Sequence, residues 1–312
     1  MKPSPVLLLP VTAALLLAGC GGGSSDDGKP TVVASFYPYA FVAEQVGGSL
    51  ASVQNLTSPG VEPHDLELRP KQVAAVQDAD LVIYQHDFQA AVDDAVDQAD
   101  RPDDSTVDVA DLVDLHTSEE DHAEQEGHHA GEHGDEDHGS MDPHVWLDPA
   151  NLEPVAEAVA DDLARIDPEH ADTYRANAQE LVDELSRLDE DFAAGLKTCE
   201  HHTIVTSHAA FGYLALKYGL EQVPIAGIDP SNEPSGKQLA AITDTVRSTG
   251  ITTIFTEELV DPSNADTIAT ATGAKVATLD PIEGLGPDTR DETYLTLMRR
   301  NLDALREANS CS

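Results

Sequence analysis

Short apolar runs alternate with stretches of helical periodicity along both halves of the chain. The strand-like runs include, in chain order, TVVASF, LVIYQH, STVDVA, TIVTS, ITTIFTEE and KVATLD. Between them lie segments with apolar residues three or four positions apart, the spacing typical of amphipathic helices. This alternation predicts βαβ units, in which parallel strands form a sheet that helices cover.

One predicted helix is much longer than the others and lies between the two halves. It runs from Pro168 to Lys197, with Asp167 as the predicted N-cap and Pro168 at the first helical position. A helix of this length reaches about 45 Å, at about 1.5 Å per residue. We interpret it as a rigid spine. Its apolar stripe consists of Tyr174, Ala178, Leu181, Leu185, Leu188, Phe192 and Leu196.

These patterns predict an α/β fold with two Rossmann-like lobes, each built on a parallel sheet, joined by one long rigid helix. The N-terminal lobe is predicted at residues 31–150, with a His-rich, acidic loop at 116–140. Helices at 151–197, including the spine, and a C-terminal lobe at 198–312 complete the chain. Open parallel sheets bind ligands beyond the carboxyl ends of their strands, so we expect the site in the crevice between the lobes.

The first 19 residues have the features of an export signal. Lys2 precedes an apolar run from Val6 to Ala18, which is shorter than the roughly 20 residues that span a bilayer. Leu17-Ala18-Gly19 before Cys20 has the pattern of a lipobox, which predicts a lipid anchor on Cys20; an ordinary signal peptide cut elsewhere is the alternative. Residues 20–30 form a Gly/Ser/Asp-rich spacer suited to a flexible leash.

The remaining cysteines fit an exported protein. With Cys20 committed to lipid, Cys199 and Cys311 are left, an even number for an oxidising compartment. We expect a disulfide between them that attaches the last helix to its lobe.

The charge balance excludes one class of partner. The chain has 58 acidic and 17 basic residues and a formal net charge of -41. Nucleic acid is excluded because its phosphates would be repelled. Such a surface attracts cations, and it equally fits adaptation to a salty medium, so it does not by itself indicate a metal site.

Metal-type ligands occur just past the ends of several predicted strands. His64 lies in the proline-stiffened loop SPGVEPHDLELRP, and His144 lies between Pro143 and the only tryptophan. His208 follows the strand TIVTS, and KVATLDPIEGLG carries Asp280 and Glu283. Taken singly, each histidine could be a solvated loop residue or a core residue. Together, imidazoles and one carboxylate from four separate loops are typical of a tetrahedral Zn(II) site, and three nitrogen donors favour zinc over manganese or calcium.

The same segments resemble a known family. PHDLELRPKQVAAVQDADLVIY, DPHVWLDP, SHAAFGYLALKYGL and LDPIEGLG are similar, in the same order, to signatures of the metal-binding lipoproteins of ABC-type uptake systems. The resemblance is to the zinc-binding, ZnuA-like group of the cluster A-I solute-binding family, and it covers nearly the whole chain from Thr31. It implies a protein that captures zinc outside the cytoplasm and delivers it to a membrane permease with its ATPase.

The resemblance also implies a ligand set of His64, His144 and His208. Manganese and iron members generally carry a carboxylate where His208 stands, so this histidine favours zinc, and another divalent metal is the alternative. The fourth ligand stays open between Asp280, Glu283 and water. Glu62, which precedes His64 by two residues, is a weaker candidate.

The segment from Glu119 to His138 has a different character from the predicted ligand loops. It combines five histidines with nine carboxylates and almost no apolar residues, so we expect it to be disordered without metal. We interpret its histidines as weak, secondary zinc ligands near the main site, and a solvated insertion without a role is the alternative. These histidines are His122, His128, His129, His133 and His138.

Other functions fit parts of the sequence. A zinc hydrolase also uses three histidines, but the chain has no HExxH motif, so we expect no enzyme activity. A surface adhesin or a freestanding metal buffer remains a further alternative. We expect a monomer on the cell surface or the periplasmic side of the plasma membrane. His86 is expected to pack or bond locally, and Asp148 to cap a helix.

Overall fold

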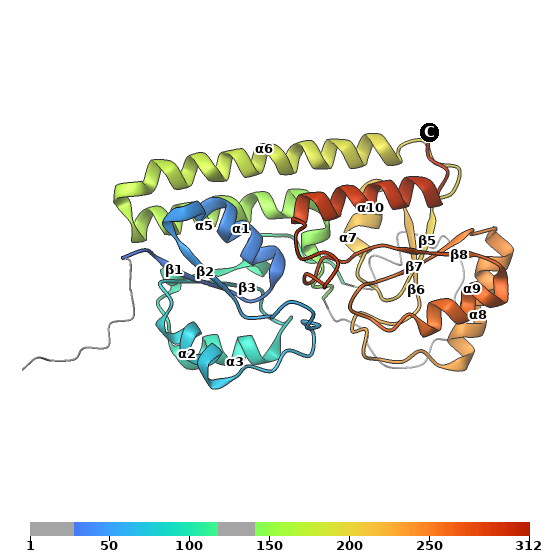
Figure 1. Ribbon diagram of the computed structural model, residues 1–312, viewed down its shortest axis with the longest axis horizontal. Helices are drawn as coiled ribbons and strands as arrows, with labels where there is room; N and C mark the ends of the chain where they lie inside the picture. The colour runs from blue at the N-terminus through green and yellow to red at the C-terminus, as the bar shows by residue number, and fades with distance from the viewer. Residues whose placement is uncertain (1–27, 118–140) are drawn as a thin grey trace, which may run out of the picture.

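The computed structural model describes residues 28–117 and 141–312 and contains two parallel four-stranded sheets with helices around them (Figure 1). The first sheet has the order β2-β1-β3-β4 and the second the order β6-β5-β7-β8. The strands are β1 (Thr31–Ala34), β2 (Ser52–Asn55), β3 (Leu81–Tyr84), β4 (Thr106–Asp108), β5 (Thr203–Thr206), β6 (Glu221–Pro224), β7 (Thr253–Thr256) and β8 (Lys275–Thr278). The predicted α/β fold with two parallel sheets is confirmed.

Helices connect the strands and form a layer that spans both sheets. The helices are α1 (Tyr37–Gly47), α2 (Pro70–Asp78), α3 (Ala90–Ala99), α5 (Leu152–Ile166), α6 (Ala171–Leu196), α7 (Gly212–Tyr218), α8 (Gly236–Thr249), α9 (Ser263–Thr272) and α10 (Tyr294–Ala308). In Figure 1, α6 runs along one side of the molecule past both sheets, with α5, α1 and α10 beneath it. Among the described residues, no helix combines the length and apolarity that a membrane span requires.

Burial differs between the central and the edge strands of each sheet. The central strands β1, β3, β5 and β7 are mostly or fully buried, whereas the edge strands β2 and β8 are largely exposed or half-buried. Helices on both faces of a parallel sheet cover its central strands, so these strands are the continuous apolar runs of the sequence. The parallel arrangement brings the carboxyl ends of the strands in each sheet to one edge, where the following loops lie.

The long helix is present, but it begins later than predicted. Residues Pro168–His170 form a 3-10 turn, and α6 starts at Ala171. Asp167 is the N-cap residue of this 3-10 turn and Pro168 begins it, as predicted, but the Asp167 carboxylate makes no side-chain cap bond and accepts the Tyr174 hydroxyl at 2.9 Å. The apolar stripe was right: the buried residues of α6 are Tyr174, Ala178, Leu181, Leu185, Leu188, Phe192 and Leu196.

The two sheets share one hydrophobic core. A single cluster of buried side chains includes Phe36 after β1, Leu185 of α6, Phe211 before α7 and Leu302 of α10. Two smaller clusters lie separately, one under α8 and α9 and one under α2 and α3. The layer of α1, α5, α6 and α10 therefore joins the two sheets through apolar packing.

A disulfide fixes the far end of this layer. Cys199, just after α6, is bonded to Cys311, just after α10, across a sequence separation of 112 residues. The Ser312 N–H also donates to the Thr198 carbonyl at 3.0 Å. The predicted disulfide is present, and it attaches the C-terminal helix to the end of the long helix.

Candidate metal centre

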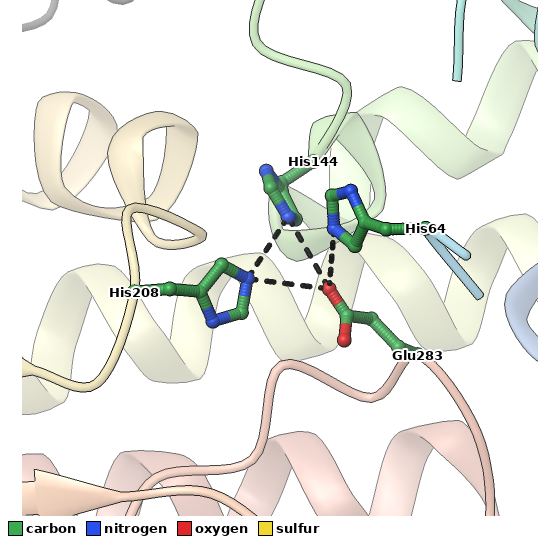
Figure 2. A group of neighbouring side chains, drawn as sticks. All are labelled: His64, His144, His208 and Glu283. Carbon is green, nitrogen blue, oxygen red and sulfur yellow. Dashed lines mark hydrogen bonds and ion pairs between the residues drawn. The ribbon is translucent and has the colours of Figure 1, made fainter. Parts of the chain in front are cut away.

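The three predicted histidines and Glu283 meet at one point. His64 lies in the loop after β2, His144 precedes the 3-10 turn η4 (Val145–Leu147), His208 follows β5, and Glu283 lies in the turn after β8. Figure 2 shows the three imidazoles and the carboxylate pointing toward one another from four separate segments. One ligand atom of each lies within 4.8 Å of the others. Each sheet, with its connections, contributes two of the four side chains.

The distances place one carboxylate oxygen at the centre of the group. Glu283 Oε1 lies 3.4 Å from His64 Nε2, 3.2 Å from His144 Nε2 and 3.4 Å from His208 Nε2. The Nε2 atoms of His144 and His208 are 3.2 Å apart. All three imidazoles therefore present the same nitrogen, Nε2, to the shared point.

The group is closed to solvent. The side chains of His144 and His208 are 0% exposed, Glu283 is 1% exposed and His64 is 7% exposed. Among the described residues, Glu283 Oε2 is buried without a partner, and the contact between Glu283 Oε1 and His64 Nε2 is at an ion-pair distance without hydrogen-bond geometry. Buried polar atoms without partners cost free energy, and a cation among the four groups would satisfy them.

Two further carboxylates orient the buried histidines from behind. His144 Nδ1 lies 2.7 Å from Asp142 Oδ1, and His208 Nδ1 lies 2.7 Å from Glu257 Oε2. Both carboxylates also accept the backbone N–H of the histidine that they orient. A carboxylate at Nδ1 holds the proton there and leaves Nε2 free to bind a metal.

The sequence interpretation missed both carboxylates, although each lies next to a recognised signal. Asp142 is in the MDPHVWLDP segment, two residues before His144, and Glu257 is the first of the two glutamates that end the strand-like run ITTIFTEE. A search for an acidic partner for each Nδ1 at the carboxyl ends of neighbouring strands would have included Glu257.

Two buried glutamines hold the prolines that precede the candidate ligands His64 and His144. The Gln85 side-chain amide donates to the Pro143 carbonyl at 2.9 Å, and the Gln89 amide donates to the Pro63 carbonyl at 3.2 Å. Between them in the chain, Phe88 packs edge-on against the His64 ring, with centroids 4.9 Å apart. These contacts fix two of the ligand loops on the β3–α3 connection.

Charge in the closed group shifts the pKa of each buried member. Burial alone would lower the pKa of His208, but Glu257 and Glu283 outweigh it and hold that pKa well above its usual value. The pKa of His144 is also raised, because Asp142 and Glu283 outweigh its burial. Burial would raise the pKa of Glu283, yet the histidines around it hold that pKa well below its usual value. Protons on His144 and His208 therefore compete with zinc for this site, and zinc binding must release them.

Asp280 lies outside this group. Its Oδ1 accepts the Ile282 N–H at 2.8 Å, and its backbone is paired with the Asn301 side chain. Burial raises the pKa of Asp280 to about 7. Of the two carboxylates that the sequence left open, the structure brings Glu283 to the imidazoles. Glu62 caps its own loop by accepting the His64 N–H at 3.1 Å.

Other candidate residues have local roles or are not described. His86 Nδ1 lies 2.6 Å from Asp108 Oδ2, in a half-exposed ion pair near Asp111. Asp148 caps the turn η5 (Pro149–Asn151) by accepting the Ala150 N–H, as predicted for a cap. Cys20 and the insertion histidines His122, His128, His129, His133 and His138 lie outside the described residues.

The chain is similar in sequence to proteins named for zinc binding or zinc uptake. The chain is 37% identical over 306 residues to the zinc-binding lipoprotein AdcA of Streptococcus pneumoniae serotype 4, covering 96% of this chain and 60% of that protein. It is 35% identical over 303 residues to the high-affinity zinc uptake system protein ZnuA of Bacillus subtilis, covering 94% of each.

Solved structures agree with the sequence relatives. The Zn(II)-bound ZnuA-like domain of Streptococcus pneumoniae AdcA superposes with a TM-score of 0.74 at 33% identity, covering 90% of this chain and 99% of that domain. The model of the family described as "zinc-uptake complex component A periplasmic" matches residues 32–308. With its fold, its ligand geometry and this match over most of its length, the chain belongs to the ZnuA family.

Proposed function

We propose that this protein is the extracytoplasmic zinc-binding component of an ABC-type uptake system. It captures one Zn(II) with high affinity and delivers the ion to a membrane permease that an ATPase drives. The chain spans 60% of the length of the AdcA relative, so the role of the longer protein is not assumed for it. The relatives named as zinc-binding and zinc-uptake proteins support this assignment.

The observation that carries the proposal is the convergence of three Nε2 atoms and one carboxylate in a closed, buried group. Zinc is bound in tetrahedral sites by imidazole nitrogen at about 2.0 to 2.1 Å and by carboxylate oxygen at similar distances. His64, His144, His208 and Glu283 supply four such ligands. Three nitrogen donors favour zinc over manganese and calcium, which bind more oxygen.

The same donor set argues against hydrolase chemistry. A catalytic zinc keeps one position open for water or substrate, whereas four protein ligands complete the tetrahedron. The four side chains are also 7% exposed or less, which leaves little access for an organic substrate. Both features support a site that stores and transfers the ion itself.

The proposal extends to the anchor and the arrangement of the chain. Cys20 would carry lipid and hold the protein outside the plasma membrane, with residues 20–30 as the leash. Residues 31–150 and 198–312 would act as the lobes around the metal, and the protein would act as a monomer. The histidines between Glu119 and His138 would collect zinc weakly beside the high-affinity site.

Removing the insertion separates the two kinds of site. A variant lacking Glu119 to His138 is expected to bind one zinc tightly in titration calorimetry and to lose only the weaker binding events. The reason is that His64, His144, His208 and Glu283 all lie outside the deleted segment. Loss of the tight step in a folded deletion variant would overturn the proposed division, and absence of any tight step in the full-length protein would overturn the proposed function.

Removing the charge of Asp142 or Glu257, the carboxylates behind His144 and His208, is expected to weaken zinc binding. Glu257→Gln is expected to lower zinc affinity by roughly 10- to 100-fold, because the amide orients His208 without the negative charge that raises its basicity. Asp142→Asn is expected to act similarly through His144. Calorimetry on the deletion variant checks both, with Asp108→Asn beside His86 as the matched control, which should leave zinc affinity unchanged.

A further inference from the structure

The turn that carries Glu283 contains an unfavourable backbone conformation. Ile282, the residue before Glu283, has a φ of 58°. This left-handed region is rare for residues other than glycine, and rarer still for a β-branched side chain. Such conformations persist only where the surroundings enforce them, and they concentrate at ligand sites. The direction in which the Glu283 side chain points therefore depends on contacts that hold the turn.

Hydrogen bonds from different parts of the chain hold the residues on either side of Ile282. Asp280 Oδ1 accepts the Ile282 N–H at 2.8 Å, from within the turn. The Trp146 indole Nε1–H donates to the Pro281 carbonyl at 2.7 Å, from a residue 135 positions away in sequence. The second bond joins the turn after β8 to the segment that carries His144.

Trp146 is itself fixed in place. Its side chain is 0% exposed, and its ring packs edge-on against Phe36, with centroids 4.7 Å apart. The Tyr294 hydroxyl of α10 donates to the Trp146 carbonyl at 2.6 Å. The indole N–H is thus a donor on a rigid support, aimed at the turn and two residues from a metal ligand.

We propose that Trp146 is a positioning residue for zinc binding, which sets Glu283 at the correct place relative to His144. The segment of His144 and Trp146 makes two polar contacts with the Glu283 turn: His144 Nε2 to Glu283 Oε1, at 3.2 Å, and the indole bond to the Pro281 carbonyl. Only the second contact is independent of the metal. Without it, Ile282 relaxes toward an ordinary backbone conformation and Glu283 turns away, which leaves three histidines and water around the zinc. This inference rests on the proposed zinc function.

The test is a double-mutant cycle between Trp146 and Glu283. Trp146→Phe is expected to lower zinc affinity by roughly 10- to 100-fold, the range typical of outer-shell partners. In a Glu283→Gln background the same change is expected to alter affinity by no more than roughly twofold, because the carboxylate that it positions is already lost. A merely structural tryptophan would instead weaken zinc binding equally in both backgrounds, and that result would overturn the proposal.

A second readout follows the ligands directly. The visible absorption of the Co(II)-substituted Trp146→Phe protein is expected to match that of Glu283→Gln, and to differ from that of the unmodified protein. A spectrum identical to the unmodified one would mean that Glu283 still binds the metal and would contradict the positioning role.

A replacement of the same size as Trp146 separates loss of the indole N–H from loss of packing. Trp146 is the only tryptophan, so benzothienylalanine, which keeps the ring size and lacks the N–H, can replace it alone. This replacement is expected to reproduce the Phe result without a cavity, and unchanged affinity with it would overturn the proposal. If the unmodified protein binds no zinc tightly, the proposed function fails; if it binds zinc but the cycle shows no coupling, only the role of Trp146 fails.

Discussion

The His208→Ala protein is expected to bind zinc far more weakly than the unmodified protein. The loss should exceed the roughly 10- to 100-fold that removal of an outer-shell partner costs, because the change removes one of the four proposed zinc ligands. His208 contributes Nε2 to the group, and its Nδ1 partner Glu257 would be left buried without an imidazole. Titration calorimetry on the variant lacking Glu119 to His138 measures this without interference from the insertion.

His86→Ala is the matched control for this experiment. His86 also pairs with a carboxylate through Nδ1, at 2.6 Å, but its side chain is 42% exposed and it lies outside the group of four. Zinc affinity should be unchanged in this variant. Equal losses in His86→Ala and His208→Ala would mean that general destabilisation, and not ligation, explains the effect.

Much of the site could be predicted because its ligands follow a simple topological rule. His64 and His208 lie just beyond predicted strands, His144 lies in a loop that follows one, and the structure brings all three together. The carboxyl ends of parallel strands meet at one edge, so residues distant in sequence converge there. The buried stripe of α6 was readable for a similar reason, because helical periodicity alone determines which face is apolar.

The choice between Asp280 and Glu283 could not be made from the sequence. Both follow the same strand, three residues apart, and both are acidic. The choice depends on Ile282 in the left-handed region, since this conformation turns Glu283 toward the histidines while Asp280 bonds the turn. That conformation is held by Trp146 and Asn301, which are distant in sequence. Local patterns do not reveal such contacts.

The start of α6 shows the same limit on a smaller scale. Asp167 followed by Pro168 is a typical helix beginning and does begin the 3-10 turn, but the Asp167 carboxylate bonds the side chains of Tyr174 and His170 and makes no side-chain cap bond there. The side chains of His170 and Tyr174, one and two turns along the helix, therefore compete with the cap for this carboxylate. The shared hydrophobic core was also beyond prediction, because periodicity identifies apolar faces but not which faces meet.

Zinc is expected to raise the melting temperature, and to do so more at pH 8 than at pH 6. A ligand at about 1,000 times its Kd adds about 4 kcal/mol to the free energy of unfolding, which corresponds to a shift on the order of 10 °C. The raised pKa values of His208 and His144 mean that protons compete with zinc to a higher pH than they would at ordinary histidines. Lowering the pH therefore weakens zinc binding and reduces the shift.

The metal-free protein should respond to pH in the opposite sense over this range. Histidines with a raised folded-state pKa contribute stability that is complete below their unfolded value of about 6.5 and is lost as pH rises through the folded value. Glu283, with a lowered pKa, contributes stability above about 4.5 that is lost only as pH falls toward its folded value. Between pH 6 and 8 the metal-free protein thus loses stability from this group while zinc binding gains strength. Melting curves of the insertion-deleted protein, with and without zinc at pH 6, 7 and 8, test both trends, and a zinc shift that stays constant with pH would contradict proton displacement from the two histidines.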